Sequence, residues 1–311
     1  MAPSAGALRR ATIVLLFAAL IWGSMIPVLA TLAQHYDIWL LSGARYLLGL
    51  PVLWLAVLLS ARPSATPGRL NWVRLLKLGA AMTGFSVFYT FGVANTHPAT
   101  AAIVLMCAPI WATLLSRLML GATTPQGFFT TLALVVGGGI VVVAGTPGRQ
   151  PGSYGLEGGE VLLVIAQLCW SWYSIRAQQW LSDRGQVALS ALTSTVASVL
   201  LAIVCLVVWG AGGITWPLRP PTIGELGMIA WVGVFGVAIA ILLWNTGVSL
   251  VGVPVASLFS NSAPIFAIGL AALFGHEPTW LQLVGGGVVL GGIGLHQLRQ
   301  MRAARLRRQS S

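Results

Sequence analysis

Charged residues are scarce in this 311-residue chain, since only 7% of its residues are Asp, Glu, Lys or Arg and 57% are hydrophobic. A typical soluble domain carries about 25% charged residues and about 45–50% apolar ones. A soluble protein of this size needs more charge to cover its surface, and a disordered chain contains fewer apolar residues. The composition excludes both classes, and a mean hydropathy of +0.87 indicates an all-α polytopic membrane protein.

Cysteine and acidic residues are rare as well. Cys107, Cys169 and Cys205 all lie inside apolar runs, so they offer neither a disulfide framework nor metal-ligand spacing. Six acidic residues against seventeen basic ones give a formal net charge of +11. In a soluble protein this excess would indicate nucleic-acid binding, but here the basic residues stand mostly at the ends of apolar runs. We therefore expect no nucleic-acid partner, no metal and no cofactor.

Ten apolar runs are long enough to cross a bilayer, for which a helix needs roughly 20 residues. They cover residues 11–33, 38–60, 72–93, 97–119, 127–145, 158–181, 187–209, 224–248, 252–274 and 280–298. Short segments rich in Pro, Gly and Arg separate several of the runs, which leaves no room for an inserted soluble domain. A signal peptide is the alternative for the first run, but that run is too long for a signal-peptide core.

The basic residues orient the ten predicted helices. With a cytoplasmic N-terminus, fourteen of the seventeen Lys and Arg residues fall on the inner side, Arg149 and Arg219 fall outside, and Arg45 lies within the second run. This asymmetry predicts that both termini are cytoplasmic. The Arg-rich tail, residues 299–311, is expected to lie near anionic lipid.

The two halves of the chain resemble each other. A shift of 155 residues places Pro109-Ile110-Trp111-Ala112 on Pro264-Ile265-Phe266-Ala267, and a shift of 148 places Trp22 on Trp170. We predict a five-helix repeat over residues 1–147 and a second over 157–298. Because five is odd, the second repeat must be inverted in the membrane. Carriers with inverted repeats bind substrate near the midplane, where the repeats meet.

Several motifs resemble the EamA-domain branch of the drug/metabolite transporter superfamily. These motifs are Ile21-Trp22-Gly23-Ser24, Arg45 with its small and apolar neighbours, the central Pro109 and Pro264, and Leu168-Cys169-Trp170-Ser171-Trp172-Tyr173. The stretch from Ala240 to Gly247 is similar to the eighth helix of YddG-type aromatic amino-acid exporters. The resemblance implies a multi-pass protein of the inner membrane that exports amino acids by alternating access.

Aromatic and polar residues near the centres of the runs are the candidate substrate-binding residues. Tryptophans at this depth lie below the usual interfacial belt and can stack on aromatic rings or ammonium groups. Amides at this depth need partners, because lipid offers none. The candidates are Trp22, Ser24, Phe85, Tyr89, Met106, Gln167, Trp170, Trp244, Asn245 and Asn261. Helix packing and interhelical hydrogen bonds are the alternative roles for these residues.

Prolines and glycines are expected to shape the bundle. Pro109 and Pro264 each remove a backbone donor at mid-depth, so they are candidate hinges of the gating helices or plain kinks. The glycines of the fifth and tenth runs, including Gly137 to Gly139, Gly287 and Gly291, permit close helix contact. We expect these glycines to pack helices within one monomer, and a homodimer contact is the alternative.

No acidic residue lies at the centre of a predicted helix, and Glu160 is expected to be the least exposed of the six. Proton carriers need a titratable group that both sides can reach, so we expect transport without proton antiport. Arg45 is expected about two turns below the outer surface. It could bind a substrate carboxylate, pair with Asp37 or Glu160, or extend to the interface. The family resemblance favours a structural role for this arginine.

The leading hypothesis is therefore a facilitative carrier that exports amino acids, aromatic or hydrophobic ones first. An aromatic lining suits such solutes better than sugars or nucleotides, whose phosphates require cationic groups. A multidrug or other small-metabolite efflux carrier is the alternative, and a channel is a weaker one. The runs contain no paired catalytic groups at a common depth, so we do not expect an enzyme.

Overall fold

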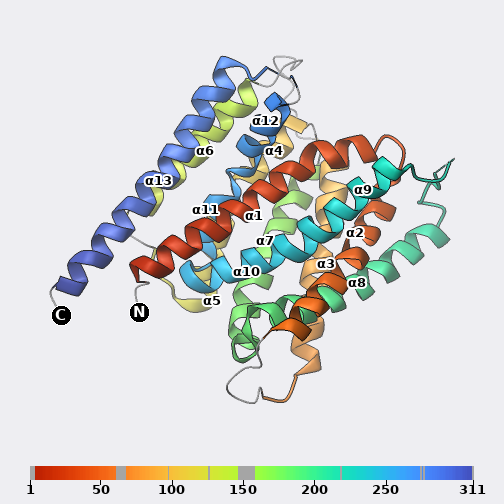
Figure 1. The fold of residues 1–311 in the computed structure, drawn as a ribbon, viewed down its shortest axis with the longest axis horizontal. Helices are drawn as coiled ribbons and strands as arrows, with labels where there is room; N and C mark the ends of the chain where they lie inside the picture. Colours follow the sequence, from red (N-terminus) through yellow and green to blue (C-terminus); the bar gives the residue numbers. More distant parts are fainter. Residues whose placement is uncertain are drawn as a thin grey trace.

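The computed structural model describes residues 4–60, 68–96, 98–124, 127–145, 158–217, 219–273, 275 and 277–309. Within these ranges the chain forms helices joined by turns, with no strand, as the composition predicts (Figure 1). The α-helices are α1 (Ala5–Leu32), α2 (Ile38–Leu59), α3 (Trp72–Ala94), α4 (Pro98–Met106), α5 (Ala108–Leu120), α6 (Phe128–Ala144), α7 (Gly159–Trp180), α8 (Gly185–Gly210), α9 (Ile223–Trp231), α10 (Ala240–Val251), α11 (Val253–Ser260), α12 (Ala263–Leu273) and α13 (Trp280–Gln309). A 3-10 turn, η1 (Ser182–Arg184), precedes α8, and a π-helical segment, η2 (Val232–Ile239), joins α9 to α10.

Among the described residues, seven helical stretches are long and apolar enough to cross a membrane. They are Ala5–Leu32, Ile38–Leu59, Thr100–Leu120, Ser182–Gly210, Ile223–Val251, Val253–Leu273 and Trp280–Gln300. Helices α3 and α7 have 23 and 22 residues but are less apolar, and α6 has only 17 residues. Each of the ten predicted ranges contains at least one helix, while ten membrane crossings and an inverted repeat stay predictions.

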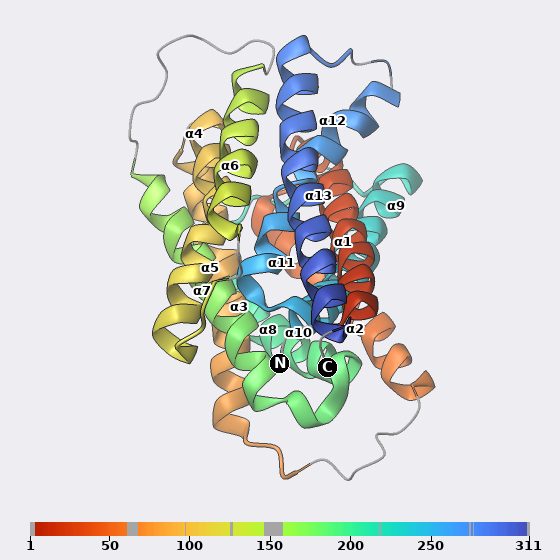
Figure 2. The ribbon, with the colours of Figure 1, turned by 90° about the vertical axis from the view of Figure 1, so that its left-hand side faces the viewer.

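Long helices lie side by side across the two halves of the sequence. Helix α13 runs along α6, α1 packs against α10 and α12, and α3 packs against α7 and α8 (Figures 1 and 2). Helix α2 packs against α8 and η2. The two ends of the chain lie at the same end of the molecule (Figure 2). Helices α1, α3, α7 and α10 therefore surround the middle of the bundle.

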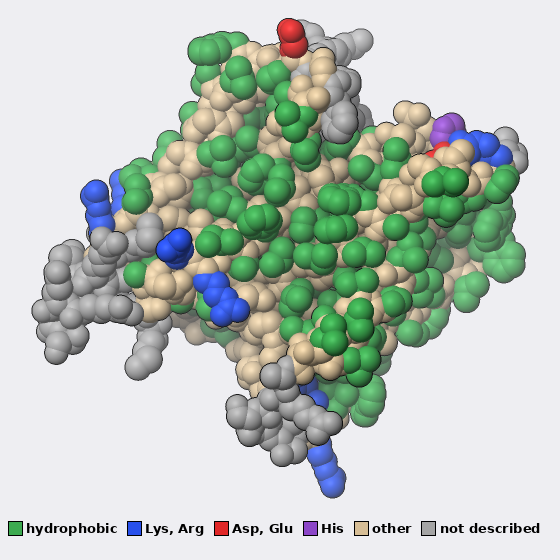
Figure 3. All heavy atoms as spheres, in the orientation of Figure 1, with side chains coloured by type: hydrophobic (Ala, Val, Ile, Leu, Met, Phe, Trp, Pro, Cys, Tyr) green, Lys and Arg blue, Asp and Glu red, His purple; other side chains and the backbone are tan. Residues whose placement is uncertain are grey.

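The outer surface of the bundle is apolar. Large side chains such as Leu58, Leu118 and Ile223 are exposed on helices. Figure 3 shows hydrophobic side chains across the middle of one face, with the visible Lys and Arg side chains toward its margins. A soluble monomer rarely exposes so large an apolar area, so this surface fits a lipid environment.

Close contact between α6 and α13 depends on two glycines. A Cβ atom at Gly285 would lie 2.5 Å from the carbonyl oxygen of Gly138, and a Cβ at Gly138 would lie 2.8 Å from that of Gly285. Gly138 is one of the glycines expected to permit close helix contact. Gly287 and Gly291 were expected to do the same on α13, but nothing lies within 4 Å of a Cβ atom at either position. That expectation is wrong because both glycines lie on a face of α13 turned away from α6.

We expect the replacement of Gly285 by alanine to destabilise the protein by about 1–3 kcal/mol, as overpacking does in other close-packed interiors. The added methyl would force α13 away from α6. Gly287→Ala is the matched control on the same helix, and its effect should be small because the site is open. The measurement is thermal unfolding of both variants in one detergent, and equal midpoints would contradict this packing.

Candidate functional site

Two helix interruptions lie next to each other near the middle of the bundle. Helix α4 ends at Met106 and α5 begins at Ala108, just before Pro109. Helix α11 ends at Ser260 and α12 begins at Ala263, just before Pro264. Both predicted proline positions therefore coincide with real interruptions, since proline removes a backbone donor from the helix ladder.

Two side-chain amides cover carbonyl groups next to the first break. Asn261 Nδ2 donates to the Met106 carbonyl at 2.7 Å, and Gln167 Nε2 donates to the Val104 carbonyl at 2.8 Å. The helix break leaves the Met106 carbonyl available to the Asn261 side chain, whereas the Val104 carbonyl also accepts from the Cys107 backbone at 3.1 Å. Asn261 therefore joins the second break to the first, and Gln167 ties α7 to α4, which is the structural role left open for these two residues.

The centre of the bundle contains an aromatic cluster of six side chains. It consists of Trp22, Phe85, Tyr89, Trp170, Tyr173 and Trp244. Trp170 lies in its middle, with ring-centroid distances of 5.1 Å to Phe85, 5.3 Å to Tyr173 and 5.8 Å to Trp244. The Trp22 and Trp170 rings are 6.2 Å apart in an edge-on arrangement. Helices α1, α3, α7 and α10 thus bring five of the predicted site residues together.

Hydrogen bonds orient two of these indoles. Trp244 Nε1 donates to Ser174 Oγ at 3.0 Å, and Trp22 Nε1 donates to the Gly236 carbonyl at 3.3 Å. Gly236 belongs to η2, and single-turn π segments often occur at functional sites. Both indoles therefore point into the bundle, where their rings lie 5.7 Å apart.

A cavity of about 270 Å³ opens between α5, α7, α10 and α11. It is lined among others by Ser116, Ser174, Gln178, Val248 and Val255. Because Ser174 also binds Trp244, the cavity reaches the edge of the aromatic cluster. The cavity lies at the end where α1 begins, since Leu15 of α1 contacts Gly247 of α10. The cavity therefore lies beside the aromatic cluster, separated from Trp244 by Ser174.

A second buried polar cluster holds Asn245, which we had predicted at the substrate site. Asn245 Nδ2 donates to Tyr173 Oη at 3.0 Å and to Ser190 Oγ at 2.9 Å. The side chain is fully buried between α7, α8 and α10. Asn245 therefore fixes Tyr173 from behind and acts on the aromatic cluster indirectly.

Ser24 is also occupied by neighbouring groups. Its hydroxyl donates to the Ile21 carbonyl at 2.7 Å and accepts from Trp231 Nε1 at 3.0 Å. Tyr173 also belongs to the aromatic cluster, although it was not among the predicted site residues. The signal was present, because Tyr173 stands three residues after Trp170 and so shares its helix face.

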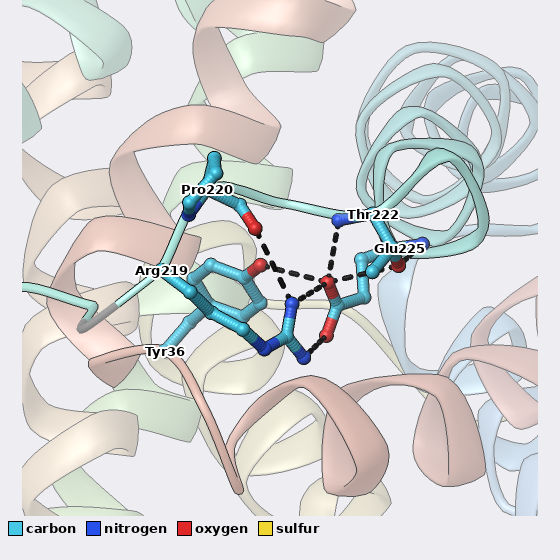
Figure 4. A network of polar contacts seen from close by, with 5 residues as sticks. All are labelled: Tyr36, Arg219, Pro220, Thr222 and Glu225. Atoms are coloured by element: carbon cyan, nitrogen blue, oxygen red, sulfur yellow. Dashed lines mark hydrogen bonds and ion pairs between the residues drawn. The ribbon is translucent and has the colours of Figure 1, made fainter.

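The opposite end of α1 carries a polar network, drawn in Figure 4. Arg219 donates from two nitrogens to the Glu225 carboxylate, at 2.8 and 2.7 Å. Tyr36 Oη donates to the same carboxylate at 3.0 Å, and the Thr222 backbone donates at 2.7 Å. The network joins the turn between α1 and α2 to the start of α9 (Figure 4).

Burial and hydrogen bonding in this network raise the pKa values of Tyr36 and Arg219. Burial, followed by the hydrogen bond to Glu225, raises the pKa of Tyr36 above its usual value of 10.0. The hydrogen bond to Glu225 likewise raises the pKa of Arg219. Because both pKa values are raised, the donors keep their protons at neutral pH, and the Tyr36 contribution is lost only as the pH rises above 10.

Carboxylates of the described segments lie at helix ends. Asp37 caps α2 by accepting from the Trp39 backbone, and Glu160 stands in the first turn of α7, where it accepts from the Gly158 backbone. Glu225 takes part in the network of Figure 4, and Glu277 is exposed. In the same segments, no group of three or more His, Cys, Asp or Glu could hold a metal ion. Glu157 lies outside the described residues.

The comparisons with known proteins place the chain in a transporter family. The model of the EamA-like transporter family matches residues 9–144 and 157–296. The uncharacterized transporter YyaM of Bacillus subtilis is 22% identical over 226 residues, which are 72% of this chain and 73% of that protein. The uncharacterized transporter YetK of the same organism is 22% identical over 275 residues, or 87% and 82% of the two chains.

One relative with a stated solute matches a shorter region. A probable terminal-alkyne amino-acid exporter of Streptantibioticus cattleyicolor is 35% identical over 131 residues, which are 42% of this chain and 41% of the exporter. A protein of known crystal structure shares the fold with a TM-score of 0.77 at 19% identity. That superposition covers 94% of this chain and 98% of the other chain.

Proposed function

Because this chain belongs to the EamA-like transporter family, we propose that it exports amino acids, aromatic or hydrophobic ones first, across the inner membrane. The chain is a multi-pass membrane protein of a transporter family. The observation that carries the substrate class is the aromatic cluster around Trp170, with a cavity beside it that is lined by Ser174. Aromatic rings stack on aromatic and aliphatic side chains and attract ammonium groups. The partial match to an amino-acid exporter supports the same class.

The proposed topology has ten membrane helices in two inverted repeats, residues 1–147 and 157–298, with both termini in the cytoplasm. The charge asymmetry of the sequence supports this orientation. The helix breaks support the repeat, since Met106 and Asn261 stand 155 residues apart and meet through a hydrogen bond. The tail beyond residue 298 would then lie near anionic lipid.

The proposed mechanism is alternating access. A cavity opens near the end where α1 begins, and at the other end a polar network joins the α1–α2 turn to α9 beneath a surface hollow that Tyr36 and Arg219 line. Trp22, Phe85, Tyr89, Trp170 and Trp244 would contact the solute between these ends. Pro109 and Pro264 would serve as the hinges at which α4–α5 and α11–α12 bend.

The proposed transport is facilitative. The carboxylates in the described part of the chain lie at helix ends, where one side of a membrane reaches them more easily than the other. Solute would therefore move down its own gradient, without a titrating carboxylate at the centre.

The test is counterflow of labelled phenylalanine in proteoliposomes that contain the purified protein. We expect saturable uptake driven by unlabelled phenylalanine inside, at a rate unchanged when the pH gradient is collapsed. Flux that requires a pH gradient would contradict facilitated transport, and Glu160 would be the first residue to replace. Inhibition by lipophilic cations without amino-acid flux would indicate drug efflux, and flux without saturation or counterflow would indicate a channel.

A further inference from the structure

Arg45 places a guanidinium inside α2, one of the seven stretches apolar enough to cross a membrane. Its hydrogen bond is a long one, 3.5 Å from Nη2 to Ser86 Oγ, and its buried Nε has no partner. A guanidinium group carries five N–H donors, so most of the hydrogen-bonding capacity of Arg45 is unused. A charge in this position is costly and usually functional.

The structural partners suggested by the sequence do not hold this arginine. Asp37 accepts from the Trp39 backbone and from the Thr215 backbone, at 2.8 and 3.1 Å. Within the described segments no ion pair joins Arg45 to Asp37 or to Glu160. The side chain turns toward Ser86 of α3, which is 1% exposed, and so points into the bundle.

The guanidinium lies at the edge of the aromatic cluster. Ser86 adjoins Phe85 in sequence. The Arg45 guanidinium also lies 5.7 Å from the centre of the Tyr46 ring, and Tyr46 packs in one buried cluster with Tyr173 and Trp170. The Phe85 ring is 5.6 Å from that of Tyr89 and 5.1 Å from that of Trp170. One fixed positive charge therefore borders one continuous aromatic surface.

We propose that Arg45 binds the carboxylate of the transported solute while the aromatic cluster holds its side chain. The proposal rests on the function proposed above and deepens it, because it makes the carboxylate a requirement for recognition. Arginine suits this role since its planar fork matches the two oxygens of a carboxylate. A single guanidinium fits a monoanion better than a phosphate dianion, which needs more positive groups.

The test compares phenylalanine with phenethylamine, which lacks only the carboxylate. Binding to the purified full-length protein is measured by isothermal titration calorimetry, and counterflow is measured in proteoliposomes. The wild type should bind phenylalanine at least tenfold more tightly than phenethylamine. Arg45→Met should bring this ratio close to one, and Arg45→Lys should give an intermediate ratio because it keeps the charge and loses the fork.

Arg74→Met is the matched control, since Arg74 is an exposed arginine near the start of α3 that stacks on Trp180. This variant should keep the wild-type ratio. If Arg45→Met does not fold, Arg45→Lys still decides the matter, because a purely structural arginine would leave the ligand ratio unchanged.

The outcomes separate the two proposals. Normal phenylalanine counterflow with an unchanged ratio in both Arg45 variants would overturn the carboxylate site alone. Carboxylate binding that depends on Arg45, without counterflow of any amino acid, would contradict the transport function and support the site. A wild type that binds neither ligand nor transports phenylalanine would overturn both.

Discussion

Replacing Trp170 by alanine is expected to weaken phenylalanine binding about 100-fold and to reduce counterflow to background. The ring contacts Trp22, Phe85, Tyr173 and Trp244, so its loss opens the centre of the aromatic cluster. Each aromatic pair is worth about 0.5–1.5 kcal/mol beyond the buried area, and about 1.4 kcal/mol corresponds to a tenfold change in affinity. Two lost contacts with the solute are therefore enough for the expected effect.

Trp172→Ala is the matched control for this prediction. Trp172 lies two residues away on α7 and contacts Trp180 instead, with ring centroids 5.5 Å apart. The control should fold and keep its transport within a few-fold of the wild type. Trp170→Phe should retain part of the binding because it restores a ring. Equal losses in Trp170→Ala and Trp172→Ala would show that the central cluster has no special role in recognition.

The aromatic centre was the part of the site most accessible from the sequence. Trp22 and Trp170 were predicted at matching places in two repeats and below the usual interfacial depth, and their rings lie 6.2 Å apart. Pro109 and Pro264 likewise predict helix breaks by their chemistry alone. The all-helical fold follows from the length and spacing of the apolar runs, which only helices satisfy in lipid.

The direction in which each side chain points could not be predicted from the sequence in the same way. Gln167, Asn245 and Asn261 are polar residues at similar depth, yet each turns toward neighbouring helices and satisfies a specific group there. Which face of a helix a residue occupies depends on how neighbouring helices pack, and the sequence pattern does not contain those contacts. The same reason explains why Gly285, and not Gly287, meets α6.

The π-helical segment and the network of Figure 4 were not predicted either. The segment η2 lies inside a continuous apolar run. A change from α to π hydrogen bonding does not alter the amino-acid composition there, so the sequence does not predict it. Glu225 is a typical helix-start residue, and it forms a capping box with Thr222. Its further bonds to Arg219 and Tyr36 depend on how two distant turns approach each other.

Replacing Glu225 by alanine is expected to open the end of the bundle that this network closes. Arg219, Tyr36 and Thr222 would lose their common acceptor. Apolar side chains lie behind the network, where Leu32, Tyr36 and Leu41 pack together with Val28 and Met228 of α1 and α9. Without the carboxylate, the turn between α1 and α2 is held to the start of α9 mainly by these contacts.

Access to this end can be measured with a single cysteine at position 24, in a background where the three native cysteines are replaced by serine. Ser24 lies eight residues before the end of α1, about 12 Å deeper along the helix. In intact cells, a membrane-impermeant maleimide should label the Ser24→Cys protein about tenfold faster when Glu225→Ala is present.

Glu225→Gln should give an intermediate labelling rate, because its amide keeps one acceptor oxygen but turns donors toward the Arg219 guanidinium. Glu277→Gln removes an exposed carboxylate and should leave labelling at the starting rate. Labelling that is fast without Glu225→Ala, or unchanged with it, would show that the network does not close the pathway. Faster labelling together with slower counterflow would instead identify Tyr36, Arg219 and Glu225 as the contacts that must form and break in each transport cycle, since a carrier that cannot close one end cannot confine its solute to the other.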